Sequence, residues 1–274
     1  MNLKWLYDLV KLASLFGLLV AAPYLSAHSL SGKTIQICED DAQWPPYSFY
    51  KIQNTQPSKE IIGYAIDVIH AIFTKQNISY AVTFLPWKRC LEELKHGDSF
   101  QMALNASFSQ YRQKTYLLSK PYYSTQKHYY YSERKYPDEL VIENIQQLKQ
   151  YQLGGIRGHS FESYGISNAL ITQRTKGYVE LINMLNAGRF DIFLGEHEII
   201  SGQANINPQI SLEKPLVFVA LNNLKRNDFY MLISRGPSYA VKLKALLDKG
   251  IGELHDSGQS EQFLKKYIKG TAIN

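Results

Sequence analysis

The sequence predicts an α/β protein with two lobes that form a clamp, each lobe a mostly parallel sheet with flanking helices. The first observation is that short apolar segments alternate with segments of helical periodicity, the pattern of βαβ units. The second is that this alternation starts again in the second half of the chain. The third is that two extended stretches, 122–131 and 222–228, could cross between lobes. We therefore expect a first lobe over 28–124 and 231–274, a second lobe over 128–226, and two hinge crossings.

The first half of the chain supplies the elements of the first lobe. β-Branched and aromatic residues dominate its predicted strands, and Pro86 and Gly97 end two of the elements. Apolar residues recur at helical spacing after Gly63. The predicted elements are a strand over 34–38, a helix that begins after Gly63, a strand over 80–85, a helix over 87–95 and a strand that begins at 102.

The second half repeats the scheme. A tight turn is expected at 158–160, and Ser160 can cap the helix that we expect to follow it. The predicted elements are a strand over 153–156, helices over 161–169 and 179–186, strands over 190–194 and 229–234, and helices over 239–254 and 261–267.

The N-terminal residues have the layout of a signal peptide. Lys4 and Lys11 come before an apolar run over 12–22, and small residues then lead to Ala27. The run is shorter than the ~20 apolar residues that span a bilayer, which favours a cleaved signal over a membrane anchor. We expect a signal peptide over 1–27, a mature chain that begins near His28, and a soluble protein in the periplasm.

Charge and cysteine content restrict the function further. The 30 basic and 24 acidic residues give a formal net charge of +6 and are interspersed, which indicates a solvated surface and not a nucleic-acid-binding one. Cys38 and Cys90 are the only cysteines. In an oxidising compartment they can pair, and two buried free thiols are the alternative. One ends the first strand and the other lies in the helix after the second strand, so we expect them to be close enough to bridge.

A series of short motifs follows the elements of both lobes. They are WPPY at 44–47, GYAID at 63–67, NASFSQYR at 105–112 and SKPYY at 119–123, then GHS at 158–160 and AGRFDIFLGE at 187–196. Their order and spacing resemble the bacterial extracellular solute-binding proteins of family 3, the polar amino-acid binders of ABC transporters. The resemblance implies a clamp of the type II periplasmic-binding-protein kind, a small ligand between the lobes, and delivery to a membrane permease.

The resemblance also implies a site for a ligand carboxylate. In the family, an arginine five residues after a serine holds this group, and Ser107 and Arg112 have that spacing. The guanidinium is a planar fork of donors that matches a carboxylate. Without the resemblance, a surface arginine paired with an acid is the simpler interpretation. Ser160 stands at the predicted helix start, which favours an anion, and the family uses this turn for the same carboxylate.

Glu196 is the candidate for the ligand's ammonium group. It follows the predicted strand over 190–194, where the family places an acid for this purpose. The usual residue is Asp, and Glu is one methylene longer. Asn105 stands where many members have Ser or Gly, which changes the size and hydrogen bonding of the pocket. A solvated loop acid is the alternative for Glu196.

Aromatic and charged residues complete the predicted pocket. Trp44 and Trp87 match positions where the family places aromatics beside the ligand, although core packing is the commoner role of such residues. Asp40, with the adjacent Asp41, loosely resembles an acid that reads cationic side chains in some members. Lys88, followed by Arg89, could instead make the mouth of the pocket favour an anion.

Catalytic motifs are missing from the sequence. It contains no P-loop, HExxH or GxSxG motif, and its histidines have no metal-ligand spacing, so we expect neither a cofactor nor catalysis. His197 beside Glu196 keeps an enzyme alternative open, because a few relatives of this fold became dehydratases or transglycosylases. A sensor component is another alternative. We expect a monomer whose partners are a small ligand and a permease.

Overall fold

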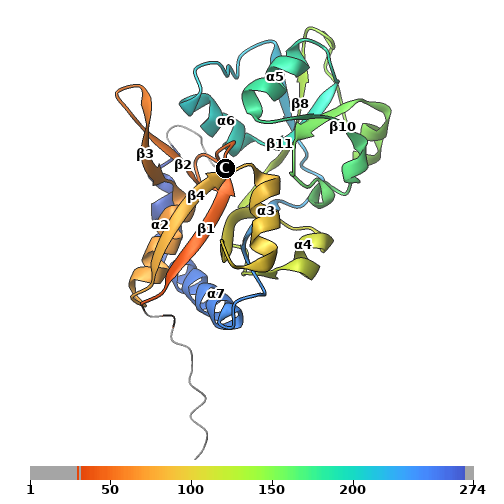
Figure 1. The fold of residues 1–274 in the computed structure, drawn as a ribbon. Helices are drawn as coiled ribbons and strands as arrows, with labels where there is room; N and C mark the ends of the chain where they lie inside the picture. Colours follow the sequence, from red (N-terminus) through yellow and green to blue (C-terminus); the bar gives the residue numbers. More distant parts are fainter. Residues whose placement is uncertain (1–29, 31, 269–274) are drawn as a thin grey trace, which may run out of the picture.

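The structure is a computed structural model that describes residue 30 and residues 32–268, and Figure 1 shows its two lobes one above the other. The predicted signal peptide over 1–27 and the predicted start near His28 lie outside the described residues. In the described part of the chain, no helix has both the length and the apolar character needed to cross a bilayer.

The first lobe is built on one mixed sheet. Its strands are β1 (Thr34–Asp40), β4 (Ser79–Leu85), β5 (Met102–Ser107), β6 (Leu117–Leu118), β7 (Tyr123–Thr125) and β13 (Asn227–Ile233), and its helices are α2 (Tyr64–Thr74), α3 (Trp87–His96), α4 (Gln110–Thr115), α7 (Ala240–Asp256) and α8 (Gln259–Lys265). The strand order is β4-β1-β5-β13-β6, and β7 also pairs with β13. β1 runs parallel to β4 and β5, whereas β13 runs antiparallel to its neighbours. α3 packs on β1 and β5, and α2 packs on β4 and α7.

The second lobe repeats this design. Its strands are β8 (Lys127–Ser132), β9 (Leu153–Ile156), β10 (Ile171–Thr175), β11 (Ile192–Glu196) and β12 (Leu216–Ala220), and its α-helices are α5 (Tyr178–Asn186) and α6 (His197–Ile206). The order is β10-β9-β11-β8-β12. β9 is parallel to β10 and β11, and β8 is antiparallel to β11 and β12. In both sheets, therefore, the parallel pairs that the sequence predicts are joined to antiparallel strands at one side.

Two crossings connect the sheets. The chain leaves the first sheet at Thr125 and enters the second at Lys127, and it returns between Ala220 and Asn227. β7 leads into the first crossing and β13 follows the second. These two strands pair with each other, with Thr125 opposite Asn227, so the two crossings lie side by side. Ligands bind preferentially at such boundaries between lobes.

Most predicted elements are present, some with shifted ends. The strands over 34–38, 80–85 and 153–156 and the helix over 87–95 all occur, and Gly97 ends that helix in a left-handed conformation with φ of 79°. The hairpin of β2 (Phe49–Gln53) and β3 (Gln56–Ile62) was not predicted.

One predicted element is wrong. The segment 161–169 forms no α-helix, but two short 3-10 turns over Glu162–Tyr164 and Asn168–Leu170. Gly165, with φ of 78°, ends the first turn in a left-handed conformation, and the Ser167 side chain caps the second by accepting a hydrogen bond from Ala169 N. The chain therefore changes direction where the sequence pattern predicts a continuous helix.

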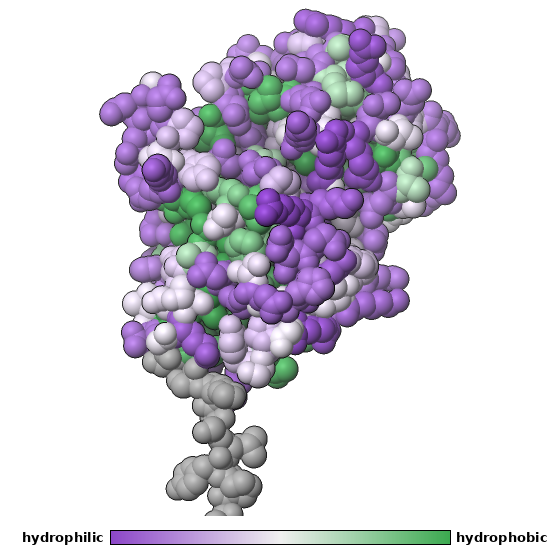
Figure 2. Space-filling model, viewed as in Figure 1, coloured by the Kyte–Doolittle hydropathy of each residue, from purple (hydrophilic) through white to green (hydrophobic). Residues whose placement is uncertain are grey.

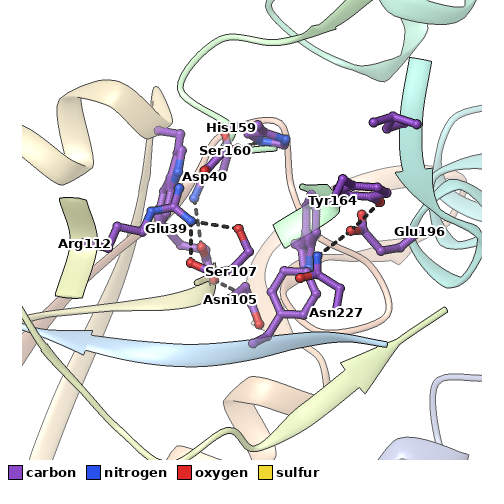
Figure 3. A pocket seen from close by; sticks show the side chains of 14 residues that line it. Glu39, Asp40, Asn105, Ser107, Arg112, His159, Ser160, Tyr164, Glu196 and Asn227 are labelled. Carbon is purple, nitrogen blue, oxygen red and sulfur yellow. Dashed lines mark hydrogen bonds and ion pairs between the residues drawn. The ribbon is translucent and has the colours of Figure 1, made fainter. Parts of the chain in front are cut away.

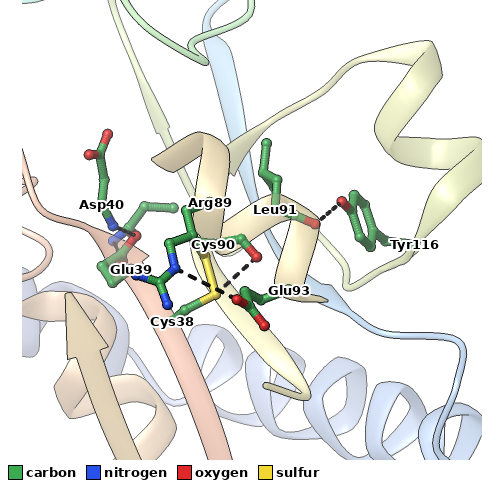
Figure 4. Close-up of a disulfide and its surroundings, with 9 residues drawn as sticks. Cys38, Glu39, Asp40, Arg89, Cys90, Leu91, Glu93 and Tyr116 are labelled. Carbon is green, nitrogen blue, oxygen red and sulfur yellow. Dashed lines mark hydrogen bonds and ion pairs between the residues drawn. A yellow bond between two sulfur atoms is a disulfide. The ribbon is translucent and has the colours of Figure 1, made fainter. Parts of the chain in front are cut away.

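Cys38 and Cys90 form a disulfide that links β1 to α3 (Figure 4). The Cα atoms lie 5.6 Å apart, within the range that a bridge requires. Both residues are fully buried beside Leu94 and Tyr116. The expected bridge is confirmed, and it fixes α3 against the strand that ends at Asp40.

The lobes share a hydrophobic core. One cluster of buried side chains combines Trp44 and Tyr47 of the first lobe with Tyr178 and Ile199 of the second. Figure 2 shows that the outer face is mostly hydrophilic, with apolar residues confined to smaller areas. Much of the apolar surface of both lobes is thus buried, part of it where the lobes meet.

Candidate functional site

A cavity of about 40 Å³ lies between the lobes (Figure 3). Its walls come from the ends of β1, β5 and β11, from the start of α4 and from the turn after β9. The lining residues are Glu39, Asp40, Trp44, Trp87, Asn105, Ser107, Arg112, His159, Ser160, Tyr164, Leu194, Glu196, Asn227 and Phe229. Since this position lies beyond the carboxyl ends of the parallel strands, it matches the usual ligand site of open α/β sheets.

Arg112 provides the cationic wall of the cavity. Ser109 caps α4 by accepting a hydrogen bond from Arg112 N at 3.1 Å, which sets the direction of the arginine side chain. Arg112 Nη1 donates to Ser107 O at 2.7 Å and to Ser107 Oγ at 2.9 Å. The guanidinium also lies 5.6 Å from the centre of the Trp87 ring. Burial lowers the pKa of Arg112 to about 10, so the group is still cationic at neutral pH.

Glu196 provides an acidic wall. It ends β11, and its Oε1 accepts hydrogen bonds from Tyr164 OH at 2.9 Å and from Asn227 Nδ2 at 2.7 Å. Burial raises the pKa of the Glu196 carboxyl, although these two hydrogen bonds act in the opposite direction. Asn227 Oδ1 is buried and accepts no hydrogen bond from any described residue. This acceptor lies beside Glu196, in a residue that lines the cavity.

A buried polar network lies at the end of β1. Glu39 Oε2 accepts hydrogen bonds from Ser48 Oγ at 2.9 Å and from Asn105 Nδ2 at 2.5 Å. Asn105 Oδ1 accepts from the hydroxyls of Tyr122 and Tyr123, at 2.6 and 3.0 Å. Because burial dominates, the pKa of Glu39 is raised to about 8.

The two lobes are in direct contact around the cavity. His159 Nε2 of the second lobe lies 2.8 Å from Asp40 Oδ2 of the first, and its ring is 5.4 Å from the Trp44 ring. Gln203 Nε2 on α6 donates to the carbonyl oxygens of Ala42 and Gln43, both at 2.9 Å. These contacts hold the lobes in a closed arrangement.

All eight predicted ligand-binding residues line this one cavity: Arg112, Ser107, Asn105, Ser160, Glu196, Trp44, Trp87 and Asp40. The helix-dipole argument for Ser160 is wrong, because no α-helix follows it; Ser160 Oγ instead accepts from Glu162 N at 3.4 Å. Glu196 was expected to follow the strand over 190–194. It is instead the last residue of β11, because this strand begins two residues later than predicted.

The weaker candidates lie elsewhere. Asp41 lines a separate surface groove beside α5. Lys88 lines an open groove of about 620 Å³ that shares Arg112, His159 and Ser160 with the cavity. Arg89 pairs with Glu93 on the surface of α3. His197 Nε2 lies 3.1 Å from Ser201 Oγ, and His197 is not among the residues that line the cavity.

Sequence reasoning missed several lining residues. Glu39 is adjacent to Asp40, and His159 lies between two residues of a motif that the sequence did single out. Tyr164, Asn227 and Phe229 carry no motif. The position of residue 227 in a predicted crossing was the one signal that could have found Asn227.

Comparisons with known proteins agree with this architecture. A family model described as bacterial extracellular solute-binding proteins, family 3, matches residues 37–270. No curated protein matches the chain. A solved substrate binding protein of an amino acid ABC transporter is 18% identical, with a TM-score of 0.66, and the match covers 86% of this chain and 99% of that chain.

Two further similar structures come from Streptococcus pneumoniae. The substrate-binding protein AbpA of an amino acid ABC transporter, bound to L-arginine, is 17% identical with a TM-score of 0.67, and the match covers 85% of this chain and 94% of that chain. An ABC uptake transporter substrate binding protein with bound histidine is also 17% identical with a TM-score of 0.67, and the match covers 90% and 97%. These likenesses show the two-lobe clamp fold that the sequence predicts.

Proposed function

Because the chain belongs to the bacterial extracellular solute-binding proteins, family 3, we propose that it captures a small polar solute between its lobes and delivers it to the permease of an ABC transporter. The solute is an amino acid or a related carboxylate. Similar proteins have been solved with L-arginine and with histidine, which supports this class of ligand.

One observation carries the proposal: a buried cation and a buried acid line the same cavity from different lobes. Arg112 Nη1 is held by Ser107, while Nε and Nη2 have no hydrogen-bond partner among the described residues. Those donors suit a ligand carboxylate. Glu196 and the unpartnered Asn227 Oδ1 are acceptors, and they suit an ammonium group. A zwitterion would satisfy both sets of groups, which are costly to bury unpaired.

Closure is the mechanism that we infer. In the open form the cavity walls would separate, and water would solvate Arg112 and Glu196. A ligand that contacts both lobes binds the closed form better and so shifts the equilibrium toward it. The contacts of His159 with Asp40, and of Gln203 with the loop after β1, would add to closure. The permease would then recognise the closed form.

The remaining parts of the proposal follow the family. We infer binding without turnover, a location in the periplasm after cleavage of the signal peptide, and action as a monomer. Catalysis would require groups that make and break bonds on the ligand. In this proposal Arg112 binds a carboxylate and Glu196 binds an ammonium group, while Asp40 is paired with His159 across the lobes.

A thermal-shift screen tests the proposal. Mature protein would be mixed with amino acids, amines and small organic acids, and the unfolding temperature would be measured. A ligand at 100 times its Kd stabilises the protein by about 2.7 kcal/mol. We expect stabilisation by at least one amino acid or carboxylate, and no product by mass spectrometry after incubation. Stabilisation by no solute, or repeated turnover of a solute, would contradict the proposal.

A further inference from the structure

We propose that Glu39 contacts the ligand and releases its proton when a ligand with a cationic side chain enters the cavity. This inference rests on the proposed function. Glu39 lines the cavity beside Asp40, and its side chain is held in one position by the backbone of Asp40 on its own strand and by Ser48 and Asn105 on two other segments. Neither the sequence motifs nor the comparisons assign it a role.

The surroundings of Glu39 fix its carboxyl group. Oε1 accepts a hydrogen bond from Asp40 N at 3.1 Å, and Oε2 accepts from Ser48 and Asn105. The hydroxyls of Tyr122 and Tyr123 donate to Asn105 Oδ1, so the amide nitrogen of Asn105 must face Glu39. Asn105 also has a φ of 53°, a left-handed conformation that Asn tolerates better than most residues. The network thus presents a carboxyl of fixed position to the cavity.

The charges around Glu39 leave it without a counter-ion. It is 1% exposed, and no Lys, Arg or His of the described residues forms an ion pair with it. The neighbouring Asp40 disfavours ionisation of Glu39, because it is also an acid, and it is paired with His159 across the lobes. Arg112 lies on the α4 wall, bonded to Ser107, and Glu196 lies on the β11 wall.

The tyrosines beside Glu39 supply no charge either. Burial keeps the pKa of the Tyr122 and Tyr123 hydroxyls well above 10, so both stay neutral. Burial also raises the pKa of Glu39 to about 8, which keeps this carboxyl protonated at neutral pH while the cavity holds no cation.

The proton balance follows from this arrangement. A neutral carboxyl and a cationic ligand group enter the complex, a carboxylate–cation pair remains, and one proton goes to solvent. The affinity for such a ligand should therefore rise by about tenfold per pH unit between pH 6 and 7.5, as expected for a group with a pKa near 8. A ligand whose side chain is neutral leaves the proton on Glu39, and its affinity should not depend on pH through this group.

Isothermal titration calorimetry in two buffers of different ionisation enthalpy measures proton release directly. The probes are L-ornithine and L-arginine, with L-citrulline as the neutral counterpart of arginine. At pH 7 we expect release of about 0.9 proton on binding of a cationic probe, because a group with a pKa near 8 is ~90% protonated there. We expect no release with citrulline. Glu39→Gln should abolish the release, and Glu60→Gln on the exposed β3 is the matched control.

The outcomes separate this inference from the proposed function. Binding of a cationic probe without proton release, or with the same release in Glu39→Gln, would overturn the role of Glu39. Failure of both cationic probes while another solute binds would overturn it too, and would leave the proposed function standing. Failure of every solute in the thermal-shift screen would overturn both. The two-buffer comparison on the unmodified protein needs no variant to fold.

Discussion

The buried Glu39 should make the stability of the ligand-free protein depend on pH. Its pKa is raised from 4.5 to about 8 in the folded protein, because burial disfavours the charged form. Below about pH 4.5 the group is neutral in both folded and unfolded states, so it imposes no penalty. As the pH rises toward 8, the unfolded state ionises freely and the folded state does not. Stability is therefore lost progressively over this range.

The magnitude follows from the shift of the pKa. Each pKa unit corresponds to ~1.36 kcal/mol, so between pH 5 and pH 8 Glu39 should remove about 3 kcal/mol of unfolding free energy. Glu39→Gln keeps the shape and cannot ionise. The free energy of unfolding of this variant, minus that of the original protein, should therefore increase by about that amount from pH 5 to pH 8.

Urea unfolding at pH 5, 6.5 and 8 provides the measurement, followed by fluorescence or circular dichroism. Glu60→Gln is the control, because Glu60 is exposed and pairs with Lys51 on the neighbouring strand of the hairpin. This control should change stability by less than ~0.5 kcal/mol at every pH. A difference between Glu39→Gln and the original protein that stays constant with pH would refute the reasoning, because Glu39 would then not titrate in this range.

Two further predictions rest on the structure, and a third rests on the N-terminal sequence. Replacing Cys38 and Cys90 by serine removes a disulfide between residues 52 positions apart and should lower the unfolding free energy by about 4 kcal/mol, measured by urea unfolding. A double variant as stable as the original protein would contradict the stabilising role of the disulfide. Gly202→Ala on α6 would place a Cβ 2.5 Å from Pro45 O of the other lobe, so it should hold the lobes apart and weaken ligand binding by about tenfold, although alanine favours the helix. Small-angle scattering should then detect a larger radius of gyration, and an unchanged radius with unchanged affinity would count against the closed arrangement. N-terminal sequencing of the protein from a periplasmic fraction should begin near His28, and an intact residue 1 in the membrane fraction would contradict export by a cleaved signal.

Periodicity and local spacing predicted much of the fold, whereas the site residues were predicted from the resemblance to a known family. The strand over 34–38 and the helix over 87–95 have strong local patterns and clear ends, so the positions of Cys38 and Cys90 could be inferred. Arg112 and Glu196 belong to motifs whose order matches a known family, and both line the cavity. Their roles toward a ligand stay predictions.

Residues whose importance depends on tertiary contacts could not be predicted in this way. At the end of β1, Glu39 and Asp40 are both buried, because the strand meets the cavity there. The alternation of inward and outward side chains along a strand therefore does not show that both of them line the cavity. His159 acts on the opposite lobe, and the sequence contains no signal of that contact. The helix expected over 161–169 failed because Gly165 adopts a positive φ, which outweighs the weak apolar periodicity around it.

The central claim is that Arg112 binds the carboxylate of a ligand held between the lobes. Isothermal titration calorimetry of Arg112→Ala, with the best solute from the thermal-shift screen, tests it most directly. Arg89→Ala is the control, because Arg89 is an exposed arginine of α3. Loss of Arg112 would leave the buried carboxylate of the ligand poorly paired at a cost of about 2–5 kcal/mol. The affinity of the variant for this solute should therefore fall by ~30-fold to several thousand-fold. The control should bind as the original protein does. Equal affinity of Arg112→Ala and the original protein for every solute that binds would contradict the account.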